Sequence, residues 1–257
     1  MSILQAWNFD WLWHGFSTRA GGVSNVYGRP GDLNLGWTKE DADASVAENR
    51  RSFSFTVTQE TGVIPVLTRQ THGVVINRVH SGITPLETEE GRAVLEGDGL
   101  ITNEPGMLIG VQTADCIPVI LVDPSHRAVG VFHAGWRGTV AGIVEAGVQR
   151  MHTEFGSQPA EMLAAIGPGI GPCCFEVGNE VRDSFRDRWL YAEMLFHGRN
   201  VDLWQANQRQ LLDSGLNTEN ITVLGECTAH QTDRFFSHRA EKGVTGRMIS
   251  AAGIRRT

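Results

Sequence analysis

The chain has 257 residues, 41% of them hydrophobic and 20% charged, which is ordinary for a soluble globular protein and enough for one large domain or two small ones. Its 29 acidic and 22 basic side chains leave a net charge of −7. That charge argues against a surface that binds nucleic acid, so we expect a small-molecule or protein partner.

The opening residues 1–16 contain three tryptophans, but they lack the basic segment, apolar core and A-x-A cleavage pattern of a secretory signal. No run approaches the roughly 18 apolar residues that span a bilayer. The four cysteines, at positions 116, 173, 174 and 227, form no regular framework, so we expect reduced thiols. These features predict a cytoplasmic protein with no membrane partner.

The N-terminal part of the chain mixes turns, one helix and short strands. Residues 14–37 are dense in Gly, Ser, Asn and Asp, which is typical of successive turns. Residues 41–58 predict a helix with an acidic first turn. One side of this helix carries Val46, Asn49, Arg50, Phe53 and Val57. Residues 64–70 and 74–79 predict strands, and the acidic residues 87–98 predict a solvated loop.

The rest of the chain alternates β-branched apolar runs with segments of helical periodicity. Strands are predicted over residues 99–102, 107–113, 117–122, 128–132, 162–166, 221–224 and 247–252. Helices are predicted over residues 138–155, 177–188 and 201–214. No repeat or linker is evident, so this order favours one α/β or α+β domain over residues 1–257, with helices covering a mixed sheet.

Three residues with metal-binding side chains each sit beside a small residue at the edge of a predicted strand. They are His72 in QTHG, Cys116 in TADC and His133 in HAGWRG. If strands 117–122 and 128–132 are neighbours, Cys116 and His133 emerge at related ends of one sheet. Two imidazoles and a thiolate form a zinc set with one position open, as in catalytic sites. The alternative is that the histidines satisfy loop backbones and that Cys116 is a small core residue.

The same residues also support the hypothesis of a catalytic site without metal. Cys116 would then be a nucleophile and His133 its base, with Asp115 or His72 orienting the imidazole. A thiolate serves either use, because it is both the nucleophile and the ligand.

Two further patterns, one of His, Glu and Cys and one of Gly and Pro, give weaker support for a function. His152-Thr153-Glu154 with Pro172-Cys173-Cys174 resembles the zinc nucleobase deaminase pattern, yet its cysteines lack the two-residue gap. Residues 167–172, GPGIGP, match no nucleotide-binding motif and predict a stiff turn with close backbone packing.

Arginines in or next to the turn-rich segments are candidates for binding an anionic group. They are Arg69, Arg137, Arg239 and Arg247. A guanidinium suits a phosphate or carboxylate, although a single arginine is more often a surface ion-pair partner.

Several of these segments occur in the order and spacing of a known family. They are FSTRAGGVS, LNLG, AENRR, QTHG, GDGLIT, TADCIPVILVD, HAGWRGT, IGPGIGPCCFEVG and FFSHR with TGR. Over nearly its whole length the chain resembles the YfiH-type family, long labelled multicopper polyphenol oxidoreductase or laccase-domain proteins and now described as purine nucleoside phosphorylases. The FFSHRAEKGVTGR segment departs from the family in carrying His238 and Ala240 where Tyr and Arg are usual.

The resemblance implies a single α/β sandwich domain and zinc held by His72, Cys116 and His133. It also implies phosphorolysis of adenosine, inosine and S-methyl-5′-thioadenosine with phosphate, and deamination of adenosine. Asp115 is a candidate acid or hydrogen-bond partner in this chemistry, and one or more of the arginines would hold phosphate.

Two other activities attached to this family lead to different expectations. Multicopper oxidases commonly carry H-x-H pairs, which this sequence lacks, and no Met lies near the three ligands, so we expect copper only as an alternative occupant. The other activity is editing of cell-wall precursors, which hydrolyses an amide of a peptidoglycan precursor. It would be compatible with Cys116 as nucleophile and His133 as base.

Overall fold

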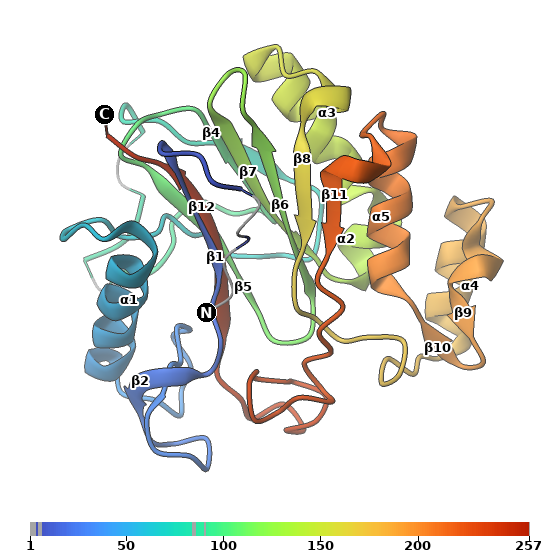
Figure 1. Cartoon of the computed structure of the whole chain (residues 1–257). Coiled ribbons are helices and arrows are strands. Elements are labelled where there is room, and N and C mark those ends of the chain that lie inside the picture. Colours follow the sequence, from blue (N-terminus) through green and yellow to red (C-terminus); the bar gives the residue numbers. More distant parts are fainter. Residues whose placement is uncertain (1–3, 5–6, 84–85, 90, 257) are drawn as a thin grey trace.

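Two β-sheets lie face to face between helices in a computed structural model, which describes residue 4 and residues 7–83, 86–89 and 91–256 (Figure 1). The three-stranded antiparallel sheet has the order β1 (Leu12–Phe16), β12 (Met248–Ile254) and β5 (Leu108–Thr113). The six-stranded sheet has the order β11 (Ile221–Val223), β8 (Leu163–Ile166), β6 (Ile117–Asp123), β7 (Ala128–Ala134), β4 (Gly99–Thr102) and β3 (Ile76–Arg78). Its outer pairs are parallel and its inner pairs antiparallel. The predicted mixed α/β sandwich is confirmed.

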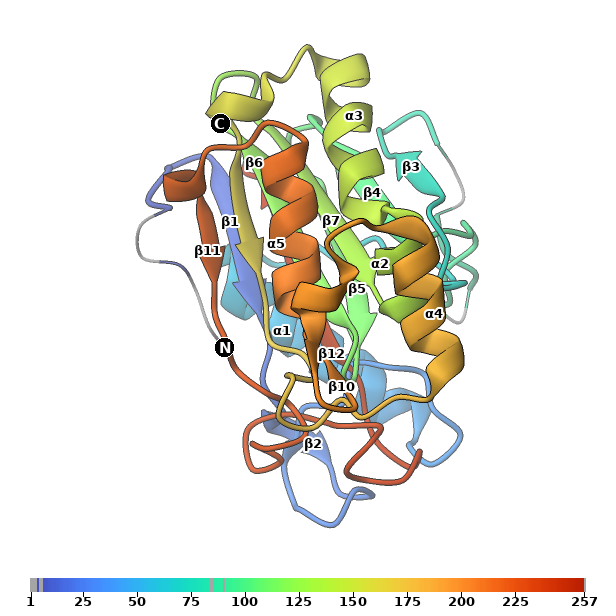
Figure 2. The same cartoon turned by 90° about the vertical axis from the view of Figure 1, so that its right-hand side faces the viewer.

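Helices cover both outer faces of this pair of sheets. The helix α1 (Asp43–Thr58) packs on the three-stranded sheet, where Phe53 and Val57 join Leu108 and Ile249. The far face of the six-stranded sheet carries α2 (Trp136–Ala141), α3 (Ile143–Phe155) and α5 (Leu203–Asp213), with α4 (Asn179–Arg188) next to α2 (Figure 2). The remaining short strands are β2 (Ala20–Ser24), β9 (Phe196–His197) and β10 (Asn200–Val201).

The continuous apolar run of β6 follows from its burial on both faces. Val119 and Leu121 pack toward the helices, whereas Ile120 and Val122 pack toward the three-stranded sheet. Alternate residues of a strand point to opposite faces, so a strand between two apolar layers needs no polar residues. None of the described helices is both long and apolar enough to cross a membrane.

Several segments differ from the sequence prediction. Residues 14–37 were expected to be turns, but they contain the end of β1 and all of β2. The strand β1 forms because it pairs with β12 from the other end of the chain, a contact that local composition does not reveal. Residues 64–70 form no strand and make only isolated bridges through Val66 and Arg69. The helix expected over residues 138–155 is two helices, because Gly142 adopts φ of 84° between them.

Close backbone packing of residues 167–172 is confirmed. A Cβ on Gly167 would lie 2.3 Å from the Phe16 ring, and one on Gly169 would lie 2.4 Å from Ile117. Glycine is therefore required where this turn packs against the sheet, next to Cys116.

Candidate metal centre

The ends of three neighbouring strands of the six-stranded sheet lie side by side, and each of these strand ends carries a polar side chain. The strands β6 and β7 are antiparallel, with Pro118 opposite His133, so Cys116 lies beside the end of β7. The strand β4 is antiparallel to β7 on its other side, which brings Asp98, one residue before β4, to the same edge. The prediction that Cys116 and His133 emerge at related ends of one sheet is confirmed.

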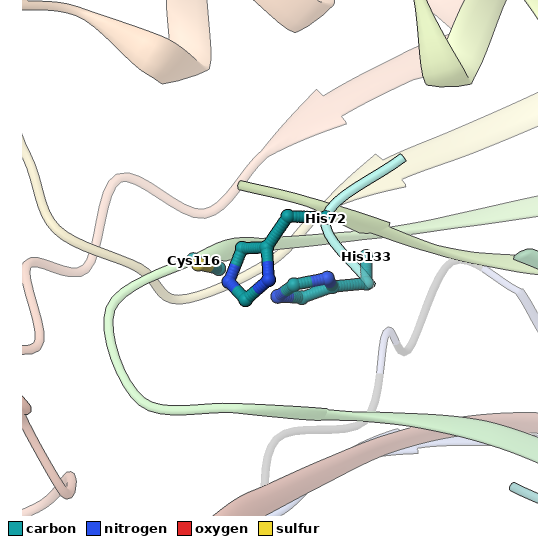
Figure 3. Close-up of side chains that lie close together, drawn as sticks. All are labelled: His72, Cys116 and His133. Carbon is teal, nitrogen blue, oxygen red and sulfur yellow. The ribbon is translucent and has the colours of Figure 1, made fainter. Parts of the chain in front are cut away.

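The structure brings His72, Cys116 and His133 together (Figure 3). One ligand atom of each lies within 4.8 Å of the other two. The two imidazole rings are 4.9 Å apart between centroids, with an interplanar angle of 77°. His133 is buried, Cys116 half-buried and His72 exposed. The three donors therefore form a set that is anchored on the protein side and accessible on the other.

A buried carboxylate, Asp98, orients both histidines. Its Oδ1 accepts hydrogen bonds from His133 Nδ1 at 2.8 Å and from the His72 backbone N–H at 2.9 Å. Its Oδ2 accepts three more, from the Thr71 backbone and hydroxyl and from the Gly73 backbone. Burial opposes ionisation, but these donors outweigh it and hold the pKa of Asp98 well below its usual range. Because Nδ1 of His133 is engaged, its Nε2 is left for a metal.

Asp98 corrects the prediction that residues 87–98 form a solvated loop, since its exposure is 0%. It is also the main site residue that was not predicted from the sequence. The available signal was an acidic residue between two glycines directly before a fully apolar strand, in GDGLIT. A carboxylate at such a position needs several donors to be buried.

Two non-glycine residues of the site have a left-handed backbone. They are His72, with φ of 62°, and Asp115, with φ of 92°. Such conformations cost about 1–3 kcal/mol each and persist where surrounding contacts hold them. The bonds to Asp98 hold His72, and the Ile170 backbone N–H, which donates to the Asp115 carbonyl at 2.7 Å, holds the segment before Cys116.

The charges of the cluster favour a thiolate. Burial alone would raise the pKa of Cys116, but the charge of and hydrogen bonds from His133 and His72 outweigh it and lower this pKa to about 6. Burial alone would lower the pKa of His133, but Cys116 and Asp98 raise it to about 9. At neutral pH these shifts favour a thiolate and an imidazolium when no metal is bound, and a metal ion would compete with the proton of His133.

The donor set and the space around it fit a metal ion. Two imidazoles and a thiolate are borderline-to-soft ligands that suit zinc or copper. Gly135, in HAGWRG, lies directly against the cluster, because a Cβ there would be 3.0 Å from both Cys116 Sγ and the His72 ring. The absence of a side chain at this position leaves room beside the three ligands.

A cavity of about 680 Å³ opens over the three donors, within the size range of small-molecule sites. Four arginines line it: Arg69, Arg92, Arg239 and Arg247. Apolar lining comes from Trp37, Ile170 and Phe175. In a chain with a net charge of −7, this concentration of arginine marks the cavity as a place for an anionic group.

The four arginines differ in their neighbours. Arg69 forms an ion pair with Glu96, and Arg92 lies 3.8 Å from Asp43. Arg247 Nη1 donates to the carbonyls of residues 245 and 246, and Arg239 Nη1 to those of residues 174 and 176. Within the described residues no carboxylate pairs with the guanidinium of Arg239 or Arg247, so their charge remains available.

Two predicted site residues have different positions from those expected of substrate-contacting groups. Arg137 is not among the residues that line the cavity, because it stacks on the ring of Trp136, 4.2 Å from its centroid. Asp115 lines the cavity, but its carboxylate accepts from Thr228 Oγ1 at 2.7 Å and from the Arg239 backbone N–H at 2.6 Å. His238, where the family usually has Tyr, also lines the cavity, and Ala240 is exposed.

The deaminase-like pattern does not form a site. His152 lies on α3, and its Nδ1 is hydrogen-bonded to the carbonyl of Ser157 at 2.9 Å. Cys173 and Cys174 instead lie close to His230.

A family model described as "Multi-copper polyphenol oxidoreductase laccase" matches residues 13–255, nearly the whole chain. The chain belongs to this family. The chain is similar to "Purine nucleoside phosphorylase YlmD" of Bacillus subtilis, with 35% identity over 250 residues, covering 94% of this chain and 88% of the relative. The resemblance to YfiH-type proteins is thereby confirmed.

Two further relatives extend the comparison. "Adenosine deaminase RL5", from an unknown prokaryotic organism, is 38% identical over 181 residues, 68% of this chain and 69% of the relative. The crystal structure of the Bacillus licheniformis hypothetical protein YfiH superposes with a TM-score of 0.86 at 32% identity, covering 95% of this chain and 93% of that one. The family and the His/Cys cluster together point to a metal-binding protein.

Proposed function

We propose that the protein is a zinc-dependent purine nucleoside phosphorylase acting on adenosine, inosine and S-methyl-5′-thioadenosine, with adenosine deaminase activity. The observation that carries this proposal is the position of the three-donor cluster His72, Cys116 and His133 under a cavity rimmed by four arginines. Relatives named purine nucleoside phosphorylase and adenosine deaminase support it.

Zinc is proposed because two imidazoles and one thiolate with a fourth side open are the ligands of a catalytic zinc site. His133 and Cys116 would hold it from the sheet and His72 from the preceding loop, while Asp98 orients both histidines. When bound, zinc supplies Lewis-acid activation of water or of a purine substituent, which deamination requires.

Phosphorolysis needs an anion held close to the ribose. A phosphate oxygen forms a bond to C1′ as the bond from C1′ to the purine nitrogen breaks, and the base leaves with the electron pair. We assign phosphate binding to Arg247 and Arg239, whose guanidinium groups have carbonyl partners but no carboxylate partner among the described residues. Trp37 and Phe175 supply flat apolar surface for the purine ring.

Asp115 acts in this proposal as a positioning residue. Its carboxylate joins Thr228 to the backbone of Arg239 and so fixes the segment that brings Arg239 to the cavity. Both of its oxygens are occupied by hydrogen bonds, which favours this role over that of a proton donor. Arg137 is left without a role in substrate binding.

The test is turnover of adenosine by protein purified without added metal, with and without phosphate. We expect ribose 1-phosphate and adenine only when phosphate is present, inosine in either case, and loss of both reactions in a strong chelator with recovery on adding zinc. Chelator-resistant turnover, or no phosphate-dependent product from any of the three nucleosides, would contradict the proposal.

A second candidate function follows from the contacts of His133 with Cys116 on one side and Asp98 on the other. The lowered pKa of the Cys116 thiol and the hydrogen bond between Asp98 and His133 Nδ1 are the features of a Cys-His-Asp hydrolase, which would cleave an amide in a peptidoglycan precursor. This activity would survive chelation and be lost on thiol alkylation. Copper-dependent polyphenol oxidation has less support, since no described methionine lines the cavity to act as an axial ligand.

The domain organisation and the cellular location can be proposed as well. We infer one domain over residues 1–257, because the strands β1 and β12 from opposite ends of the chain pair in register over their length. None of the four cysteines forms a disulfide, which favours the cytoplasm.

A further inference from the structure

A second group of metal-binding side chains lies outside the cavity just described. One ligand atom each of Cys173, Cys174 and His230 lies within 4.8 Å of the other two. A fourth residue, Cys227, is buried and interacts with the thiols of Cys173 and Cys174, although it lies outside this group of three. None of the four lines the cavity over the candidate metal centre. Two thiols and an imidazole thus lie close together, with a third, buried thiol beside them.

Two tight turns present these side chains. In the first, the backbone N–H groups of Cys174 and Phe175 both donate to the Gly171 carbonyl at 3.0 Å. In the second, the Gln231 N–H donates to the Cys227 carbonyl at 3.0 Å, which closes one helical turn. Residues three apart in such a turn lie on the same face, so Cys227 and His230 point to the same side.

The two turns are joined by backbone contacts that hold the donors in register. The Thr228 N–H donates to the Gly169 carbonyl at 3.0 Å, and Gly169 forms a bridge with Cys227. The Gly171 N–H donates to Cys227 Sγ at 3.2 Å. A backbone N–H that donates to a sulfur is an outer contact of the kind that metal ligands usually have.

We propose that Cys173, Cys174, Cys227 and His230 form a second, structural zinc site. Tetrahedral zinc with Zn–S bonds of about 2.3 Å places its sulfur ligands about 3.8 Å apart, which is the scale of this cluster. Three thiolates and one imidazole complete the coordination, so no position stays open for substrate, as in structural sites. The site also accounts for exposed Cys173, since an exposed free thiol is otherwise prone to oxidation.

The site would stiffen one wall of the catalytic cavity. Phe175, directly after the cysteine pair, lines the cavity, and the Cys174 carbonyl accepts from Arg239 Nη1 at 3.3 Å. On the other turn, Thr228 Oγ1 donates to Asp115, next to Cys116. Zinc at the second site would therefore add a covalent-strength link between two segments that are joined by hydrogen bonds, and the proposal does not depend on which reaction the cavity supports.

The first test is the zinc content of the full chain purified without added metal. We expect about two zinc ions per chain in the wild type and about one in either the Cys116→Ser variant or the Cys173→Ser/Cys174→Ser variant. His230→Ala should also lose about one equivalent, whereas the control His197→Ala, at another exposed histidine, should lose none. A wild-type content of one that Cys116→Ser abolishes would overturn the proposal.

The second test uses Co²⁺ as a probe in a His72→Ala/Cys116→Ser background, which removes the first site. Co²⁺ bound by the three thiolates should give intense thiolate-to-cobalt absorption and tetrahedral bands, and both should disappear on adding Cys173→Ser/Cys174→Ser. Circular dichroism verifies that each variant is folded. Octahedral cobalt only, or a disulfide among residues 173, 174 and 227 in protein prepared under nitrogen, would overturn the proposal.

Discussion

The two clusters of thiols and imidazoles in this molecule use similar donors in opposite settings. His72, Cys116 and His133 lie at the edge of a rigid sheet, with Asp98 behind them and a cavity in front. Cys173, Cys174 and His230 lie on two exposed turns, with Cys227 beside them. We therefore expect the surroundings, more than the donor types, to make the first cluster catalytic and the second structural.

The largest expected effect is at the first cluster. Cys116→Ser should lower nucleoside turnover by more than about a hundredfold, since loss of a ligand should exceed the effect of losing an outer contact. Cys173→Ser/Cys174→Ser should keep measurable turnover and mainly lower the midpoint of thermal unfolding. Measuring kcat and unfolding for both variants separates the roles. Equal loss of turnover in the two would break the comparison.

The thiols of the two clusters should also differ in reactivity once metal is removed. The pKa of Cys116 is lowered to about 6, whereas burial and the thiols of Cys173 and Cys227 raise the pKa of Cys174 to about 12. Above pH 6 Cys116 is therefore mostly thiolate, and Cys174 remains protonated through neutral pH. In chelator-treated protein at pH 7, iodoacetamide should modify Cys116 about a hundredfold faster, allowing for the lower nucleophilicity of a low-pKa thiolate.

Peptide mass spectrometry over pH 5 to 9 measures this difference. The rate at Cys116 should rise to a plateau with its midpoint near the value above, while the rate at Cys174 should keep rising with pH. Comparable rates at pH 7 would show that the two clusters do not differ as the structure indicates.

Asp98→Asn tests whether the buried carboxylate distinguishes the first cluster. Loss of this outer contact should weaken zinc affinity by about 10- to 100-fold, measured by competition with a chromophoric chelator. The matched control is Asp123→Asn, which removes a buried carboxylate bonded to His126 Nδ1 at 2.8 Å, away from the cavity. Both variants should lose stability, and only Asp98→Asn should lose zinc. Equal zinc affinity in the two variants would refute the role of Asp98.

The smallest effect is expected at the cavity rim. Arg247→Ala should raise the KM for phosphate by about tenfold, the loss of one charge-assisted hydrogen bond, without changing zinc content. Arg69→Ala is the control, because Arg69 is already paired with Glu96, and its effect should be smaller. Initial rates at varied phosphate give both values. A larger effect at Arg69 would reverse the assignment.

Much of the fold could be predicted from local patterns. The strand β4 was predicted with its observed bounds, and the side of α1 that carries Val46 and Phe53 is buried as expected. These elements have strong periodicity or continuous apolar runs, because their neighbours are apolar layers. The strand β1 could not be predicted, since the strand with which it pairs, β12, lies at the other end of the sequence.

The candidate site was partly predictable for the same reason. Cys116 and His133 flank adjacent strands, so their proximity followed from the order of elements. Asp98 was missed because an acidic segment is ordinarily solvated, and only the folded sheet shows five donors around its carboxylate. Arg92 was missed and Arg137 included because sequence position does not indicate which guanidinium groups face the cavity.

The most direct test of the central claim is anomalous diffraction at the zinc absorption edge, from crystals of protein prepared without added metal. The account predicts a peak bounded by His72 and His133 nitrogens and by Cys116 Sγ, with its remaining side facing the arginine-rimmed cavity. The absence of a peak there, with the Cys116 thiol fully occupied by His133 alone, would contradict it.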